Sequence, residues 1–123
     1  MNIIEVNTSN YTQYQNLDIV AFSFANPGAQ GEGGGIKFVT SDKRICHTNY
    51  VKSISLDEAF QICPPLKDCN FALFDASPPT GWTFFYMGGG NFLVVKDQFK
   101  DTIIKTIPEG LYNHWIESLY QVL

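Results

Sequence analysis

Basic residues are scarce in this sequence. Eight Lys and Arg stand against twelve Asp and Glu, and the first basic residue along the chain is Lys37. A protein that binds nucleic acid directly needs a basic face that displaces counterions, so this composition argues against that class. An acidic chain can instead attract a basic protein, because complementary charge steers association.

Long apolar runs and cysteine pairs are also missing. Nothing approaches the roughly 20 consecutive apolar residues of a membrane-spanning helix, and no N-terminal run has the pattern of a signal peptide. The three cysteines, Cys46, Cys63 and Cys69, are odd in number and do not form a disulfide framework. We therefore expect a cytoplasmic protein with free thiols and no membrane segment.

The chain has enough apolar residues for one core. Hydrophobic residues make up 45% of its 123 residues, and charged residues make up 16%, below the roughly 25% typical of soluble domains. A chain of this length fits a single domain. We predict one domain over residues 1–123.

Three short apolar runs follow one another near the middle of the chain, at residues 70–76, 81–87 and 91–95. Only turn-forming residues separate them: Ser77-Pro78-Pro79-Thr80 at the first join and three glycines at the second. Runs rich in Val, Phe, Tyr and Trp between such joins are typical of strands and hairpins. The sequence predicts a three-stranded antiparallel meander here.

Further strands are predicted before this meander. Residues 1–6 suit a short edge strand, and residues 18–25 are apolar on both faces, as in a central strand. Residues 26–35 contain five glycines, which predicts an exposed loop. Residues 34–40 and 45–51 then read as two strands that we expect to be half-buried at best.

Two helices have recognisable start signals. Ser55 and Glu58 form a capping-box pattern for a helix over residues 56–63, which the following prolines end. Thr106 and Glu109 repeat the pattern before an apolar stripe spaced four residues apart, which predicts a C-terminal helix. Residues 97–105 fit either a short helix or a strand.

Together these elements predict an α+β fold: a mostly antiparallel sheet of about five to six strands, a C-terminal amphipathic helix on one face, and a short helix between the two strand groups. Trp115 and Leu119 should contact the sheet. The expected contacts come from some of Phe71, Leu73, Phe84, Tyr86, Phe92 and Val94, and the sequence does not determine which sheet face carries the helix.

Residue types that could support chemistry are present, but their spacing is poor. The glycines at residues 28–35 match neither a dinucleotide fingerprint nor a phosphate-binding loop followed by a helix. Cys46 and His47 are adjacent, and therefore point to opposite faces of a strand, and Cys63 and Cys69 enclose two prolines. A nucleophilic site would need His47 or His114 to meet a cysteine in space. We expect no metal and no cofactor, and the sequence favours binding over catalysis.

Aromatic residues are abundant at 15% of the chain, and they alternate along two adjacent predicted strands. If one sheet face lacks a helical cover, either Trp82 and Tyr86 or, on the other face, Phe85 and Met87 would be exposed and could anchor a partner. The acids around them and at the first helix would pair with basic groups of that partner. The predicted partner-binding residues are Asp57, Glu58, Trp82, Tyr86, Asp97 and Asp101.

These observations lead to a first hypothesis with two alternatives. The first is an interaction protein that binds and neutralises a partner, of the kind exemplified by bacterial immunity proteins that block a basic toxin domain. One alternative is a small-molecule-binding or enzymatic domain with a pocket between the sheet and the C-terminal helix, where Cys46, His47 or His114 would supply polar groups. The other is a homodimer formed through an exposed sheet face or edge strand.

Overall fold

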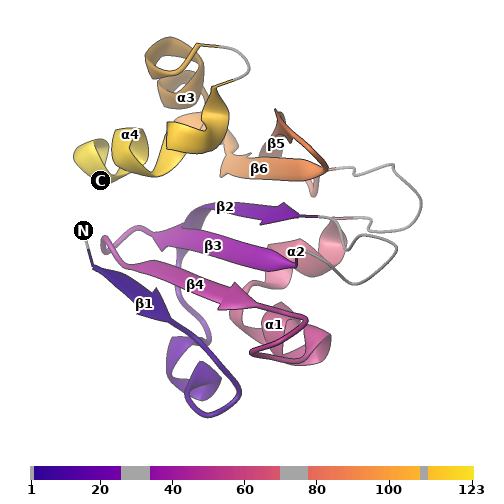
Figure 1. The fold of residues 1–123 in the computed structure, drawn as a ribbon. Helices are drawn as coiled ribbons and strands as arrows, with labels where there is room; N and C mark the ends of the chain where they lie inside the picture. Colours follow the sequence, from indigo (N-terminus) through magenta and orange to yellow (C-terminus); the bar gives the residue numbers. More distant parts are fainter. Residues whose placement is uncertain (1, 26–33, 70–77, 109–110) are drawn as a thin grey trace.

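A six-stranded sheet forms the centre of the protein in the computed structural model, which describes residues 2–25, 34–69, 78–108 and 111–123. Its order is β1-β4-β3-β2-β6-β5, and every pairing is antiparallel except that of β1 with β4 (Figure 1). The strands are β1 (Ile3–Glu5), β2 (Ile19–Ala25), β3 (Gly35–Thr40), β4 (Ile45–Asn49), β5 (Trp82–Gly88) and β6 (Asn91–Lys96). The predicted α+β class and mostly antiparallel sheet are confirmed.

Helices cover both faces of this sheet (Figure 1). The described helices are α1 (Leu56–Ile62), α2 (Pro64–Asp68), α3 (Lys100–Thr106) and α4 (Trp115–Val122), with 3-10 turns η1 (Tyr11–Tyr14), η2 (Asp97–Phe99) and η3 (Tyr112–His114). We call the face under α1, α2 and η1 the first face, and the face under α3 and α4 the second face. In the part of the chain that the structure describes, no helix combines the length and the apolarity needed to cross a bilayer.

β2 is the central strand that its sequence predicts, buried on both sides. Phe22 and Phe24 point into the first-face core, and Ala21 points into the second-face core. A register shift between Ile19 and Ala21 places Ile19 on the first face but Val20 on the second. This bulge breaks the period-two alternation, so the consecutive residues Val20 and Ala21 share the second face.

The pair formed by β3 and β4 is more deeply buried than predicted. Phe38 and Cys46 are fully buried on the first face, and Val39 and Ile45 are buried on the second. The prediction of a half-buried pair was wrong because β3 and β4 lie inside the sheet, between β2 and β1. Both of their faces therefore receive helical cover.

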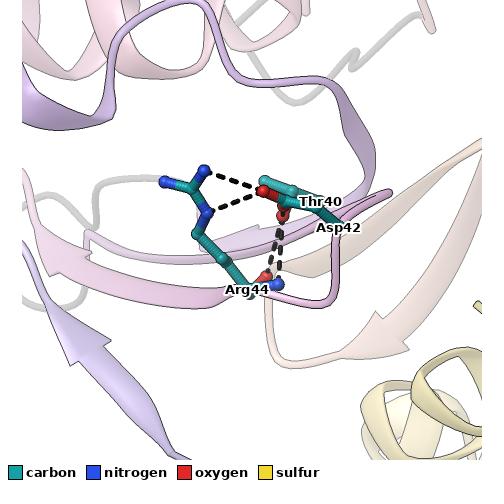
Figure 2. Close-up of polar contacts among 3 residues, drawn as sticks. All are labelled: Thr40, Asp42 and Arg44. Carbon is teal, nitrogen blue, oxygen red and sulfur yellow. Dashed lines mark hydrogen bonds and ion pairs between the residues drawn. The ribbon is translucent and has the colours of Figure 1, made fainter.

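A compact polar turn joins β3 to β4 (Figure 2). The Asp42 carboxylate accepts hydrogen bonds from the Thr40 hydroxyl and, at 2.8 Å, from Arg44 Nε, while the Arg44 backbone N–H donates to the Thr40 hydroxyl oxygen at 3.1 Å. The Thr40 hydrogen bond, followed by those from Arg44, lowers the pKa of Asp42 against the opposing effect of burial. Lys43 closes the turn with φ of 65°, in the left-handed region that favours glycine.

The capping box predicted at α1 is present. The Ser55 hydroxyl oxygen accepts the Glu58 backbone N–H at 3.1 Å, and the Glu58 carboxylate accepts the Ser55 backbone N–H at 2.9 Å. The helix ends at Ile62, and Pro64 begins α2. Proline suits that first helical position because its missing N–H would have no intrahelical acceptor there.

The predicted start of the C-terminal helix was wrong. Thr106 is the last residue of α3, and its hydroxyl donates to the carbonyl of Thr102 instead of capping a new helix. Glu109, the other half of the predicted box, lies outside the described residues. The final helix begins only at Trp115, after η3. The ambiguous residues 97–105 form η2 and most of α3.

The C-terminal helix packs on the face opposite to the predicted contacts. Trp115 and Leu119 belong to the second-face core together with Phe85 and Leu93. Phe84, Phe92 and Val94 belong to the first-face core, and Tyr86 is exposed beside Phe92. Phe71 and Leu73, like the whole predicted strand 70–76, lie outside the described residues; the strands predicted at 81–87 and 91–95 are confirmed as β5 and β6.

Candidate functional site

Aromatic side chains line the first face at the β5 end of the sheet. Trp82, Phe84 and Tyr86 alternate along β5, so they share one face, and Phe92 of β6 lies among them. The Phe92 ring centroid is 5.6 Å from that of Phe84 and 5.4 Å from that of Tyr86. We call these four residues the aromatic strip. Tyr86 is 59% exposed, so the structure brings the predicted residues Trp82 and Tyr86 together on a partly open surface.

Buried rings of β2 support the strip from inside the sheet. Phe22 makes an edge contact with Trp82 at 5.6 Å between centroids, and Phe24 stacks on Phe92 at 5.5 Å. Both supporting residues are almost fully buried. Trp82 and Phe92 are therefore held in place from below, which reduces the entropy that these two rings lose when a partner binds.

A charged pair lies beside Trp82. Lys96 Nζ is 2.7 Å from Asp18 Oδ1 and 5.9 Å from the centroid of the Trp82 ring. The hydrogen bond from Lys96, with a second from Ser41, lowers the pKa of Asp18. The ammonium group thus stays near the indole face, where the attraction between a cation and the ring adds to the packing.

The backbone of β5 has an outer side. The Asp97 backbone N–H donates to the Gly81 carbonyl at 3.0 Å. Gly81 and Asp97, which flank the paired strands β5 and β6, are therefore a hydrogen-bonded pair of the antiparallel ladder. Such pairs alternate in an antiparallel ladder, so Thr83 faces β6 while the N–H and C=O groups of Phe84 and Tyr86 point away from it. Among the described strands, none pairs with this outer side.

A groove of about 620 Å³ opens next to Trp82. Four prolines and one acid supply most of its described lining, which comprises Pro64, Pro65, Asp68, Pro78, Pro79, Thr80 and Trp82. Asp68 is exposed at the end of α2. The groove therefore offers a rigid apolar wall with a carboxylate at its rim.

Two of the predicted acids lie near the strip in the chain but have different surroundings. Asp97 follows β6, and its Oδ1 accepts the Thr83 hydroxyl at 2.6 Å. Asp101 is exposed in the first turn of α3, which covers the second face. Asp97 can therefore contribute charge beside the outer strand, whereas Asp101 lies on the helical layer behind it.

The other two predicted acids lie away from the strip. Asp57 and Glu58 begin α1, and the Glu58 carboxylate also accepts the hydroxyl of Thr8, which follows β1. The Ser55 backbone N–H is the main cause of the lowered pKa of Glu58. β1 and β5 are opposite edges of six strands, roughly 24 Å apart at the usual strand spacing. The structure thus separates Asp57 and Glu58 from Trp82 and Tyr86.

The cysteines lie within the first-face core. Cys46, Cys63 and Cys69 are buried, and burial raises the thiol pKa of all three, to about 11 for Cys46 and about 12 for Cys69. These thiols are protonated at neutral pH and are weak nucleophiles.

His47 follows Cys46 on β4, so its side chain points to the opposite face of the sheet from the thiol. His47 Nδ1 is 3.0 Å from Glu5 Oε2, and His114 is exposed in η3, on the second-face side. Within the described ranges, no group of three His, Cys, Asp or Glu side chains could hold a metal ion. The space predicted for a pocket beneath the C-terminal helix is occupied by buried Trp115, Leu119 and Phe85.

The proline-lined groove was not anticipated from the sequence. The available signal was the pair of Pro-Pro steps at residues 64–65 and 78–79, which flank a strand-like run and lie close together in space. Read only as helix and strand terminators, these prolines gave no indication that they share a surface with Trp82.

Comparison with family models, with curated proteins and with solved structures finds no match to this chain.

Proposed function

We propose that this protein is an interaction module that binds and neutralises a basic protein partner, in the manner of bacterial immunity proteins that block a toxin. The observation that carries the proposal is the aromatic strip, in which Tyr86 is 59% exposed although its ring is held against Phe92. Exposed, well-supported aromatic residues are the residues that most often dominate the binding energy of protein interfaces.

The charge of the chain supports a basic partner. The net charge is −4; Asp68 lines the same groove as Trp82, and the backbone of Asp97 bonds to Gly81, the residue before Trp82. Acids at the rim of an aromatic surface accelerate association with a basic protein and disfavour acidic competitors. A cytoplasmic location is part of this proposal, because the three buried thiols suit a reducing compartment.

Affinity capture from the native lysate, followed by mass spectrometry of bound proteins and small molecules, tests the proposal. Tyr86→Ser should lower the affinity for the captured protein about 30-fold, as expected for the loss of an aromatic hot spot. Asp97→Lys should slow association and weaken its dependence on salt. A captured protein that binds Tyr86→Ser and wild type equally well, or a retained small molecule with no protein, would contradict the proposal.

Asp57→Lys serves as the matched charge reversal on the other side of the molecule. Asp57 is exposed in the first turn of α1, and its neighbour Glu58 contacts Thr8, which follows β1 at the opposite edge of the sheet from β5. If binding is centred on the strip, this variant should change the association rate less than Asp97→Lys does. A larger effect from Asp57→Lys would move the interface to the α1 side.

A further inference from the structure

We propose that two copies of this chain pair through β5, edge to edge and antiparallel, with Phe84 of each copy opposite Tyr86 of the other. This inference concerns a second copy of the chain and does not depend on the heterologous partner proposed above. It rests on three features of β5: its composition, the direction of its backbone groups and the exposure of Tyr86.

The composition of β5 makes it self-compatible. Its seven residues, Trp82–Gly88, contain no charged residue and no proline. Natural edge strands usually prevent unwanted pairing by being short or by carrying charges or proline. The chain as a whole carries a charge of −4, so two copies repel each other at long range. The uncharged β5 edge lets two copies meet without placing like charges opposite each other.

The backbone of β5 selects the register. The N–H and C=O groups of Phe84 and Tyr86 point outward, as the bond between Asp97 and Gly81 shows. The Trp82 N–H already donates to the Pro79 carbonyl at 3.1 Å, so that end of the outer edge is occupied by a turn. A two-fold axis centred on Phe85 avoids this turn and pairs Phe84 with Tyr86 twice. The outward N–H groups of Phe84 and Tyr86 in the two copies, four in all, then find acceptors.

The side chains of the strip agree with this register. Phe84 and Tyr86 point to the same face, so pairing would place each beside the other residue of the second copy. Aromatic cross-strand pairs of this kind stabilise antiparallel sheets. The pairing would also cover part of Tyr86, the most exposed aromatic ring of the described strip. The contact is isologous, because both copies use the same edge, and it therefore closes at two subunits.

Sedimentation equilibrium of the full chain tests the pairing, with Tyr86→Pro and Tyr86→Val as a matched pair. Both variants lose the ring, but only proline removes the outward N–H, and neither touches the bonds to β6. We expect a micromolar dimer for the wild type. Tyr86→Pro should weaken it about 10- to 100-fold beyond Tyr86→Val, because one hydrogen bond is lost from each copy. A wild type that remains monomeric up to about 1 mM would overturn the proposal.

Amide hydrogen exchange keeps the test decisive if Tyr86→Pro fails to fold. In the wild type, the amides of Phe84 and Tyr86 should exchange more slowly as the protein concentration rises, while that of Thr83 stays protected throughout. Fast exchange of Phe84 and Tyr86 at every concentration would overturn the pairing. Protection that is independent of concentration in a monomer would also overturn it, since the edge would then be covered within one copy.

Discussion

The two edges of the sheet are built in different ways. β1 has three residues, runs parallel to β4, and carries Glu5, whose carboxylate meets His47 at 3.0 Å. β5 has seven residues with no charge and no proline, and its exposed aromatic ring is Tyr86. A short, charged strand is a poor template for a further strand, whereas a longer apolar one is a good template. The contrast makes β5 a better template for a further strand than β1.

The largest expected effect comes from a proline on the side of β5 that bonds to β6, compared with a proline on its outward side. Thr83→Pro removes an N–H that faces β6, and we expect it to lower the free energy of unfolding by about 2–4 kcal/mol, because a ladder bond is lost and its acceptor is left unpaired. Urea denaturation measures the change. Thr83→Val is the control, since it removes only the hydroxyl bonded to Asp97. A cost from Thr83→Pro no larger than that from Tyr86→Pro would show that the outward side of β5 has been assigned to the wrong residues.

A smaller effect is expected on the β1 side, where α1 is tied to the segment after β1. Ser55→Ala should lower the free energy of unfolding by about 1 kcal/mol, because the N-terminal cap of α1 is lost. Thermal unfolding should report the change as a lower midpoint temperature. An unchanged midpoint would mean that α1 is held by Ala59 and Ile62 in the core and not by its cap.

The pH dependence of stability tests the other half of the α1 capping box, the Glu58 carboxylate that accepts hydrogen bonds from Ser55 and Thr8. The pKa of Glu58 is lowered in the folded protein, so its charged form stabilises the fold above the ordinary value of 4.5. That contribution is lost as the pH falls through the lowered folded-state pKa. Glu58→Gln should therefore destabilise at neutral pH and converge with the wild type in acid. A difference that persists unchanged in acid would contradict the role of the charge.

The smallest effect is expected at the β1 edge itself. Glu5→Gln should change the free energy of unfolding by no more than about 0.5 kcal/mol, because exposed ion pairs contribute little. If the short length of β1 is enough to prevent edge-to-edge aggregation, the variant should remain as soluble as the wild type. Tryptophan fluorescence during a urea titration measures the free energy of unfolding, and light scattering measures aggregation. Marked aggregation would assign the protection to the charge of Glu5.

Local rules predicted the parts of the fold that depend on neighbouring residues. The apolar run of β2, the two strands β5 and β6, and the Ser55–Glu58 capping box follow from spacing and turn chemistry alone. The start of the last helix did not, because Thr106 was already used by α3. Capping patterns indicate where a helix can begin, and packing decides which of the candidate starts is used.

Face assignment and surface grouping could not be obtained in this way. Alternation along β5 shows that Trp82 and Tyr86 share a face, but not that α4 lies on the other one. That choice depends on how the connections cross the sheet. For the same reason the sequence joined Asp57 with Trp82 in one proposed surface, whereas the strand order separates them. The prolines of the groove come together only through this three-dimensional arrangement.

The order of the strands also bears on how the chain assembles. β2, β3 and β4 are consecutive hairpin partners, as are β5 and β6, so each group can form from contacts close in sequence. The join between the groups is the pairing of β2 with β6, which brings Ala21 against Val95. During synthesis, one side of β2 must therefore stay without its final neighbour until β6, which ends at Lys96, has emerged. Closing such a long loop is slow, and we expect this central seam, not either hairpin group, to set the folding rate.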